Sequence, residues 1–121
     1  MARETILVVD DSPTDLRMVT SLLQSRGYMV ITANDGEEAL EKATREHPHL
    51  MVLDIILPKK NGFQVCRQLK TSPDTRGIKI LMLTCKAQDS DRYWGLKQGA
   101  DDYLNKPFED QDFLKSIDQL I

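Results

Sequence analysis

The sequence lacks the features of disulfide-rich, secreted and membrane-spanning proteins. Its two cysteines, Cys66 and Cys85, form no CxxC pair, so neither a disulfide framework nor a cysteine metal site is expected. We interpret both as reduced, packed thiols. No stretch of about 18 apolar residues occurs, and the N-terminal MARETILVV lacks the long apolar segment of a secretory signal. A cytoplasmic location without membrane insertion is therefore expected.

The chain also lacks an excess of either charge. It has 16 Lys and Arg against 19 Asp and Glu, a net charge of -3, which gives no case for nucleic acid or an anionic membrane as partner. A chain of 121 residues can bury a core without metal or disulfide bonds, and no repeat, low-complexity stretch or linker divides it. We expect one domain over residues 1–121, as a monomer or weak dimer.

Apolar segments of strand length recur along the chain, at 5–10, 28–33, 50–55, 78–84 and 100–105. Four of them are almost continuously apolar, which is typical of strands buried on both faces of a parallel sheet. Amphipathic segments with helical spacing lie between them, and the last two helices are expected at 89–98 and 110–120. This alternation predicts an α/β, flavodoxin-like fold: a doubly wound, five-stranded parallel sheet of order 2-1-3-4-5 with helices on both faces.

One acid interrupts the third apolar segment. In LMVLDIILPKKNG (50–62), Asp54 lies among residues suited to a core, where a carboxylate is costly to bury without partners. In such a sheet, ligands bind beyond the carboxyl ends of the strands. The polar residues at those ends are Asp10 and Asp11, Asp54, Thr84, and Asn105 with Lys106.

Three carboxylates at one edge repel one another. Lys106 supplies one positive charge, and the remaining surplus of two negative charges would be balanced by one divalent cation. Mg²⁺, or Mn²⁺, suits a site of oxygen ligands, whereas zinc is not expected because the motif has no histidine. Asp54 is then placed to attack a phosphoryl group and form an aspartyl phosphate, with Thr84 and Lys106 donating to phosphoryl oxygens.

Taken together, these residues resemble the receiver domain of two-component response regulators, the CheY-like family. The resemblance spans nearly the whole chain and is carried by VVDDSP (8–13), DIILPKKNG (54–62), LT (83–84) and GADDYLNKPF (99–108). It implies Asp54 as the phosphoacceptor. It also implies a magnesium site made by Asp11, Asp54 and the backbone carbonyl of Ile56, with Asp10 acting through metal-bound water.

The same resemblance implies a switch and partners. Thr84 would move onto the phosphoryl group, Tyr103 would follow inward, and a cis Lys106–Pro107 bond would aim the lysine into the site. A histidine kinase would donate the phosphoryl group and a downstream protein would be the target. The protein would assist its own phosphorylation and dephosphorylation without being an enzyme. The stretch YWGLKQGA (93–100) is similar to receivers of type IV pilus twitching-motility pathways.

The expected output face combines the helix at 89–98, the strand at 100–105 and the helix at 110–120. Tyr93 and Leu96 share one face of the first of these helices, and Trp94 points about 100° away from Tyr93, off the expected core stripe. We interpret Trp94 as a partner-binding anchor, because tryptophan is enriched in interface hot spots. Coverage of the helix edge is the alternative.

Other interpretations remain open for each residue alone. Taken alone, Asp10 and Asp11 are better explained as helix caps, and Tyr103 is explained equally well as a half-buried strand aromatic. A phosphatase with an aspartyl nucleophile is disfavoured, because Ile56 stands two residues after Asp54, where such enzymes have a second acid. A docking module that has lost phosphorylation is a third possibility.

Overall fold

The computed structural model describes residues 4–85, 93 and 96–121. Its strands are β1 (Thr5–Val9), β2 (Met29–Ala33), β3 (Leu50–Leu53), β4 (Lys79–Thr84) and β5 (Asp102–Asn105). Its helices are α1 (Pro13–Ser25), α2 (Gly36–Glu46), α3 (Gly62–Thr71) and α5 (Asp110–Leu120). The helix expected at 89–98 falls mostly outside the described residues.

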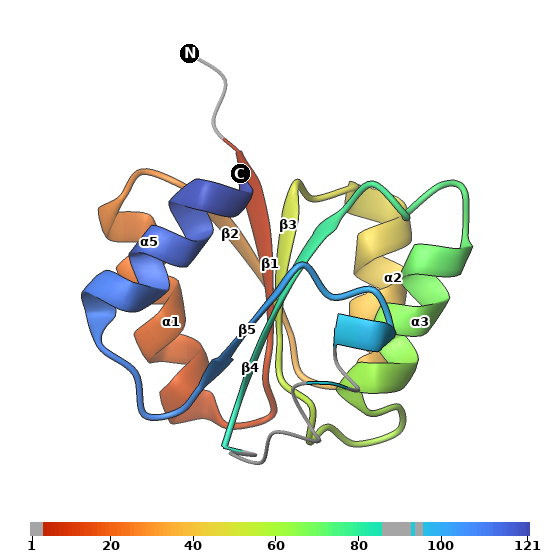
Figure 1. Cartoon of the computed structure of the whole chain (residues 1–121), viewed down its shortest axis with the longest axis horizontal. Helices are drawn as coiled ribbons and strands as arrows, with labels where there is room; N and C mark the ends of the chain where they lie inside the picture. The colour runs from red at the N-terminus through yellow and green to blue at the C-terminus, as the bar shows by residue number, and fades with distance from the viewer. Residues whose placement is uncertain (1–3, 86–92, 94–95) are drawn as a thin grey trace.

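All neighbouring strands pair in parallel, and the sheet has the order β2-β1-β3-β4-β5. Helices α1 and α5 cover one face of the sheet, and α2 and α3 cover the other (Figure 1). The predicted doubly wound architecture is confirmed. Strand β2, whose end carries no reactive residue, lies at one edge of the sheet. The strands whose ends carry the polar candidate residues, β1, β3, β4 and β5, are therefore adjacent.

The near-continuous apolar strands reflect two separate cores. Along β1, Ile6 and Val8 pack in the core with α1 and α5, and Leu7 and Val9 pack in the core on the opposite face. Successive side chains of a strand point to opposite faces, so a strand covered on both sides needs apolar residues at every position. Among the described residues, 4–85, 93 and 96–121, no helix has the length and apolar composition that a membrane-spanning segment requires.

Helix caps fix where the chain turns away from the sheet. Ser12 is the N-cap of α1, and its side chain accepts from the Asp15 backbone N–H, so Asp10 and Asp11 do not cap this helix. Asn61 caps α3 in a reciprocal capping box with Gln64. Serine and asparagine, and not the strand-end acids, therefore cap the helices that follow β1 and β3.

Two packing expectations were wrong. Cys66 is buried, and burial raises the pKa of its thiol to about 12, but Cys85 is exposed because it follows the last residue of β4 and leaves the sheet. Tyr93 and Leu96 are 57% and 40% exposed, so the face that they share is not the core stripe. Helical spacing identifies residues on one face without showing which face meets the sheet. Trp94 lies outside the described residues.

The first residue of α3 packs directly on the chain that carries Asp54. A Cβ atom at Gly62 would lie 2.4 Å from the Asp54 carbonyl oxygen and 2.8 Å from the Ile55 Cα, whereas a Cβ at Gly77 would meet nothing within 4 Å. We expect Gly62→Ala to lower the free energy of unfolding by about 1–3 kcal/mol, because backbone would have to move. Urea denaturation measures this. Gly77→Ala is the matched control and should change stability little; equal effects of the two substitutions would contradict the packing argument.

Candidate functional site

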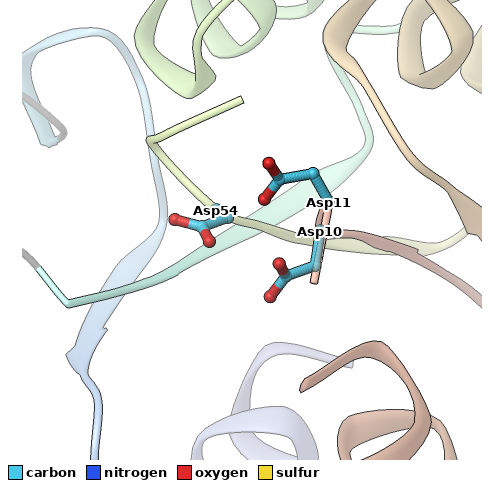
Figure 2. Close-up of side chains that lie close together, drawn as sticks. All are labelled: Asp10, Asp11 and Asp54. Carbon is cyan, nitrogen blue, oxygen red and sulfur yellow. The ribbon is translucent and has the colours of Figure 1, made fainter. Parts of the chain in front are cut away.

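Three acids lie where β1 and β3 end side by side. Asp10 and Asp11 directly follow β1, and Asp54 directly follows β3, its parallel neighbour (Figure 2). One carboxylate oxygen from each of the three lies within 4.8 Å of the others. The structure therefore brings together the acids that the sequence pattern had placed at one edge of the sheet.

Two of these acids are buried, and each accepts a hydrogen bond from the backbone N–H two residues later. Asp10 is 4% exposed and its Oδ1 accepts from the Ser12 backbone N–H at 2.9 Å. Asp54 is 8% exposed and its Oδ1 accepts from the Ile56 backbone N–H at 3.2 Å. Asp11 is exposed. These hydrogen bonds orient two carboxylates before any ligand arrives, while the third faces solvent.

Lys106 joins this cluster from the loop after β5. Its ammonium donates to Asp10 Oδ2 at 2.7 Å, to Asp15 Oδ2 at 2.9 Å and to Asp54 Oδ2 at 3.4 Å, and its side chain is 8% exposed. Burial alone would lower the pKa of Lys106, but hydrogen bonds to Asp10 and Asp15 and the charge of Asp54 outweigh it and raise the pKa above the usual range. The Lys106–Pro107 bond is cis, as expected.

Asp15 is a member of the site that the sequence interpretation missed. It lies in the first turn of α1, where an acid is ordinarily explained by the helix dipole and by capping. Its spacing of five residues from Asp10 follows no strand or ligand motif. The only available signal was its position in the turn directly after β1, above the carboxyl end of that strand.

The expected switch residues occupy different environments. Thr84 ends β4, where its backbone pairs in register with Asn105 of β5. Tyr103 is 1% exposed and belongs to the core between the sheet and α3, so it is not the half-buried strand residue of the alternative interpretation. It already occupies an inward position. The switch roles of both residues remain predictions.

The charge of the site is more negative than the sequence suggested. Among the residues that the structure describes, the carboxylates of Asp10, Asp11, Asp15 and Asp54 and the ammonium of Lys106 leave a formal surplus of three negative charges. The three strand-end acids provide only oxygen ligands, and one of them is exposed to solvent. Such a set fits a hard divalent cation that keeps several waters, as Mg²⁺ does. The arrangement suits phosphoryl chemistry, which depends on positioning and charge neutralisation.

Comparison with known proteins shows extensive similarity. The family model of the response regulator receiver domain matches residues 6–118. The chain is 40% identical over 121 residues to Protein PilH of Pseudomonas aeruginosa, with 98% of that protein covered. It is 50% identical over 103 residues to the alkaline phosphatase synthesis transcriptional regulatory protein PhoP of Bacillus subtilis, but spans only 42% of PhoP.

Solved structures agree closely with this fold. The chemotaxis protein CheY4 of Vibrio cholerae has a TM-score of 0.92 and 33% identity, and the match covers 99% of this chain and 100% of that one. The receiver domain of the sensor histidine kinase PA1611 from Pseudomonas aeruginosa PAO1 has a TM-score of 0.90 and 30% identity, with 98% of each chain covered. That structure holds a magnesium ion coordinated in its active site cleft.

We expect the site to depend on Lys106 for stability when no metal is bound. Lys106→Met should lower the free energy of unfolding by about 3 kcal/mol in EDTA, because it leaves the buried Asp10 and Asp54 without their shared cation. Chemical denaturation at neutral pH measures the loss. Lys59→Met, which removes an exposed lysine 3.7 Å from Asp35, is the control and should cost less than about 1 kcal/mol. Equal losses would argue against a structural role of the buried ammonium.

Proposed function

The chain belongs to the response regulator receiver domain family, and we propose that it is a phosphorylation switch in which Asp54 accepts a phosphoryl group from a histidine kinase. The observation that carries the proposal is the environment of Asp54. A buried carboxylate at the end of a rigid strand lies 3.4 Å from a lysine ammonium and beside two further acids. A carboxylate so placed is oriented as a nucleophile and would serve poorly as a purely structural residue.

In the proposed step, a carboxylate oxygen of Asp54 forms a bond to phosphorus while the bond from phosphorus to the donor breaks. From phosphohistidine the imidazole leaves and takes up a proton; from acetyl phosphate, acetate leaves. Lys106 would donate to an oxygen of the transferred group, and Thr84 would donate its hydroxyl to another. Attack by water on the aspartyl phosphate would release phosphate and restore Asp54.

We propose Mg²⁺, or Mn²⁺, as the cofactor. Asp11 and Asp54 would bind it together with the backbone carbonyl of Ile56, and Asp10 would act through a bound water. When bound, the ion would neutralise charge on the transferring phosphoryl group. Support comes from the oxygen-only donor set of this chain and from the magnesium ion in the related receiver domain of PA1611.

The proposed response runs from Thr84 through Tyr103 to a protein-binding face that includes β5 and α5. Both β5 and the end of β4 border the site, so a shift of Thr84 toward a phosphoryl group would reach the Tyr103 strand directly. Trp94 remains the proposed anchor for a downstream protein. The whole-chain similarity to PilH and to the chemotaxis protein CheY4 supports a place in twitching-motility or chemotaxis-like signalling.

The two other functions are less well supported. A phosphatase with an aspartyl nucleophile would need a second acid where this chain has Ile56, whose side chain is 58% exposed and apolar. A docking module without phosphorylation would have no need of a buried Asp54 beside Lys106. The phosphorylation experiment below separates this last possibility from the proposal.

Mg²⁺ should stabilise the unphosphorylated protein, because it relieves repulsion among acids that only the folded chain gathers. At a concentration ten times the dissociation constant, the gain should be about 1.4 kcal/mol. Melting curves with and without Mg²⁺, at constant ionic strength, measure it. Asp11→Ala should abolish this gain and raise the metal-free midpoint, since one repelling charge is gone.

Asp74→Ala controls for loss of an acid elsewhere, since Asp74 is exposed and lies outside the acidic cluster. This variant should respond to Mg²⁺ as the unaltered protein does. A midpoint that does not move with millimolar Mg²⁺ in the unaltered protein would rule out the proposed metal site.

Acetyl phosphate with Mg²⁺ should add one phosphoryl group, at Asp54, because Lys106 holds this buried carboxylate less closely, at 3.4 Å, than it holds Asp10, at 2.7 Å. Intact mass spectrometry detects the addition. Asp54→Asn should prevent it, and Lys106→Ala and Thr84→Ala should still accept the group but bind the downstream partner poorly. The product should be labile to base and to hydroxylamine, as an acyl phosphate is. Modification that persists in Asp54→Asn or survives hydroxylamine would falsify the assignment.

A further inference from the structure

The ammonium of Lys106 is shared with an acid that the strand ends do not supply. Its distance to Asp15 Oδ2 is 2.9 Å, shorter than its 3.4 Å distance to Asp54 Oδ2. A lysine ammonium has three N–H donors, and Lys106 has three carboxylate partners, Asp10, Asp15 and Asp54. Every donor of this ammonium is therefore already engaged.

A phosphoryl group on Asp54 would change which acceptors compete for the N–H donors of Lys106. It brings strong acceptor oxygens and additional negative charge into the space beside the lysine. Lys106 can donate to them fully only if it gives up one of its present partners. The exposed fractions of the side chains show which partner is easiest to release: 5% for Asp10, 11% for Asp54 and 35% for Asp15.

Asp15 also has room to be hydrated after release. Together with Lys106 it lines a cavity of about 310 Å³, whose other walls include Met18, Cys85 and Phe108. Water in that cavity can replace the ammonium as the partner of a partly exposed carboxylate, whereas a buried carboxylate that loses its cation bears the full cost of desolvation.

We propose that Asp15 is a positioning residue that keeps one N–H donor of Lys106 engaged until phosphorylation and thereby slows the acceptance of a phosphoryl group. This inference rests on the proposed function of Asp54. The carboxylate of Asp15 competes with the incoming group for one N–H donor of the lysine. Removing that carboxylate frees the donor, so phosphorylation becomes faster.

The test compares initial rates of phosphoryl addition from acetyl phosphate with Mg²⁺, followed by intact mass. Asp15→Asn and Asp15→Ala should both react at least threefold faster than the unaltered protein. Asp15→Glu, which keeps the charge, should stay within twofold of it. Asp112→Asn is the matched control, because Asp112 is an exposed acid at the same third position of α5 as Asp15 is of α1, and its rate should not change.

A double-mutant cycle separates competition for the lysine from a general effect of charge. In a Lys106→Met background, Asp15→Asn should have little effect on the rate. A direct readout needs neither metal nor phosphate: exchange of the Lys106 ammonium hydrogens with water, measured by NMR, should be faster in Asp15→Asn than in the unaltered protein and unchanged in Asp112→Asn.

Three results would overturn the inference. They are an Asp15→Asn rate equal to or below that of the unaltered protein, an Asp15→Glu rate as high as that of Asp15→Asn, and an Asp15→Asn effect of the same size with and without Lys106. Failure of the unaltered protein to take up any phosphoryl group would instead reject the proposed function, so the two failures are distinguishable.

Discussion

The ammonium of Lys106 is the contact on which the functional edge of the sheet depends. It lies among carboxylates from the loop after β1, the first turn of α1 and the end of β3, and it reaches them from the loop after β5. In the strand order, β3 and β4 stand between β1 and β5. One side chain thus connects segments that the sheet keeps apart, and it partly balances acids that repel one another.

The sheet itself limits how this contact can form. Parallel strands bring all their carboxyl ends to one edge, and the adjacency of β1 and β3 sets Asp10, Asp11 and Asp54 within a few ångströms. Close backbone packing then fixes the loop after Asp54, since Gly62 lies against the Asp54 carbonyl with no room for a Cβ atom. Backbone geometry thus brings together acids that repel one another, and the Lys106 ammonium offsets part of that repulsion.

Sequence patterns predicted most of this arrangement, for a physical reason. A continuous apolar run indicates a strand that is buried on both faces. A polar residue at the end of such a run lies at the edge of the sheet, and this rule predicted the positions of Asp10, Asp54 and Lys106. Asp15 was missed because an acid in the first turn of a helix has an ordinary explanation in the helix dipole. The exposure of Cys85 was missed because exposure just past a strand end depends on the loop and not on local pattern.

The position of Asp54 within an apolar run now has a physical account. Its Oδ1 accepts from the backbone N–H of Ile56 and its Oδ2 accepts from Lys106, so protein groups provide hydrogen bonds to the buried charge. Lys106, the partner at Oδ2, also donates to Asp10 and Asp15, at shorter distances. In the proposed phosphorylation, a group added to Asp54 would therefore redistribute the donors of this lysine among its acceptors. A chemical change at one oxygen of Asp54 would in this way alter the contacts between Lys106, which follows β5, and the acids after β1 and in α1.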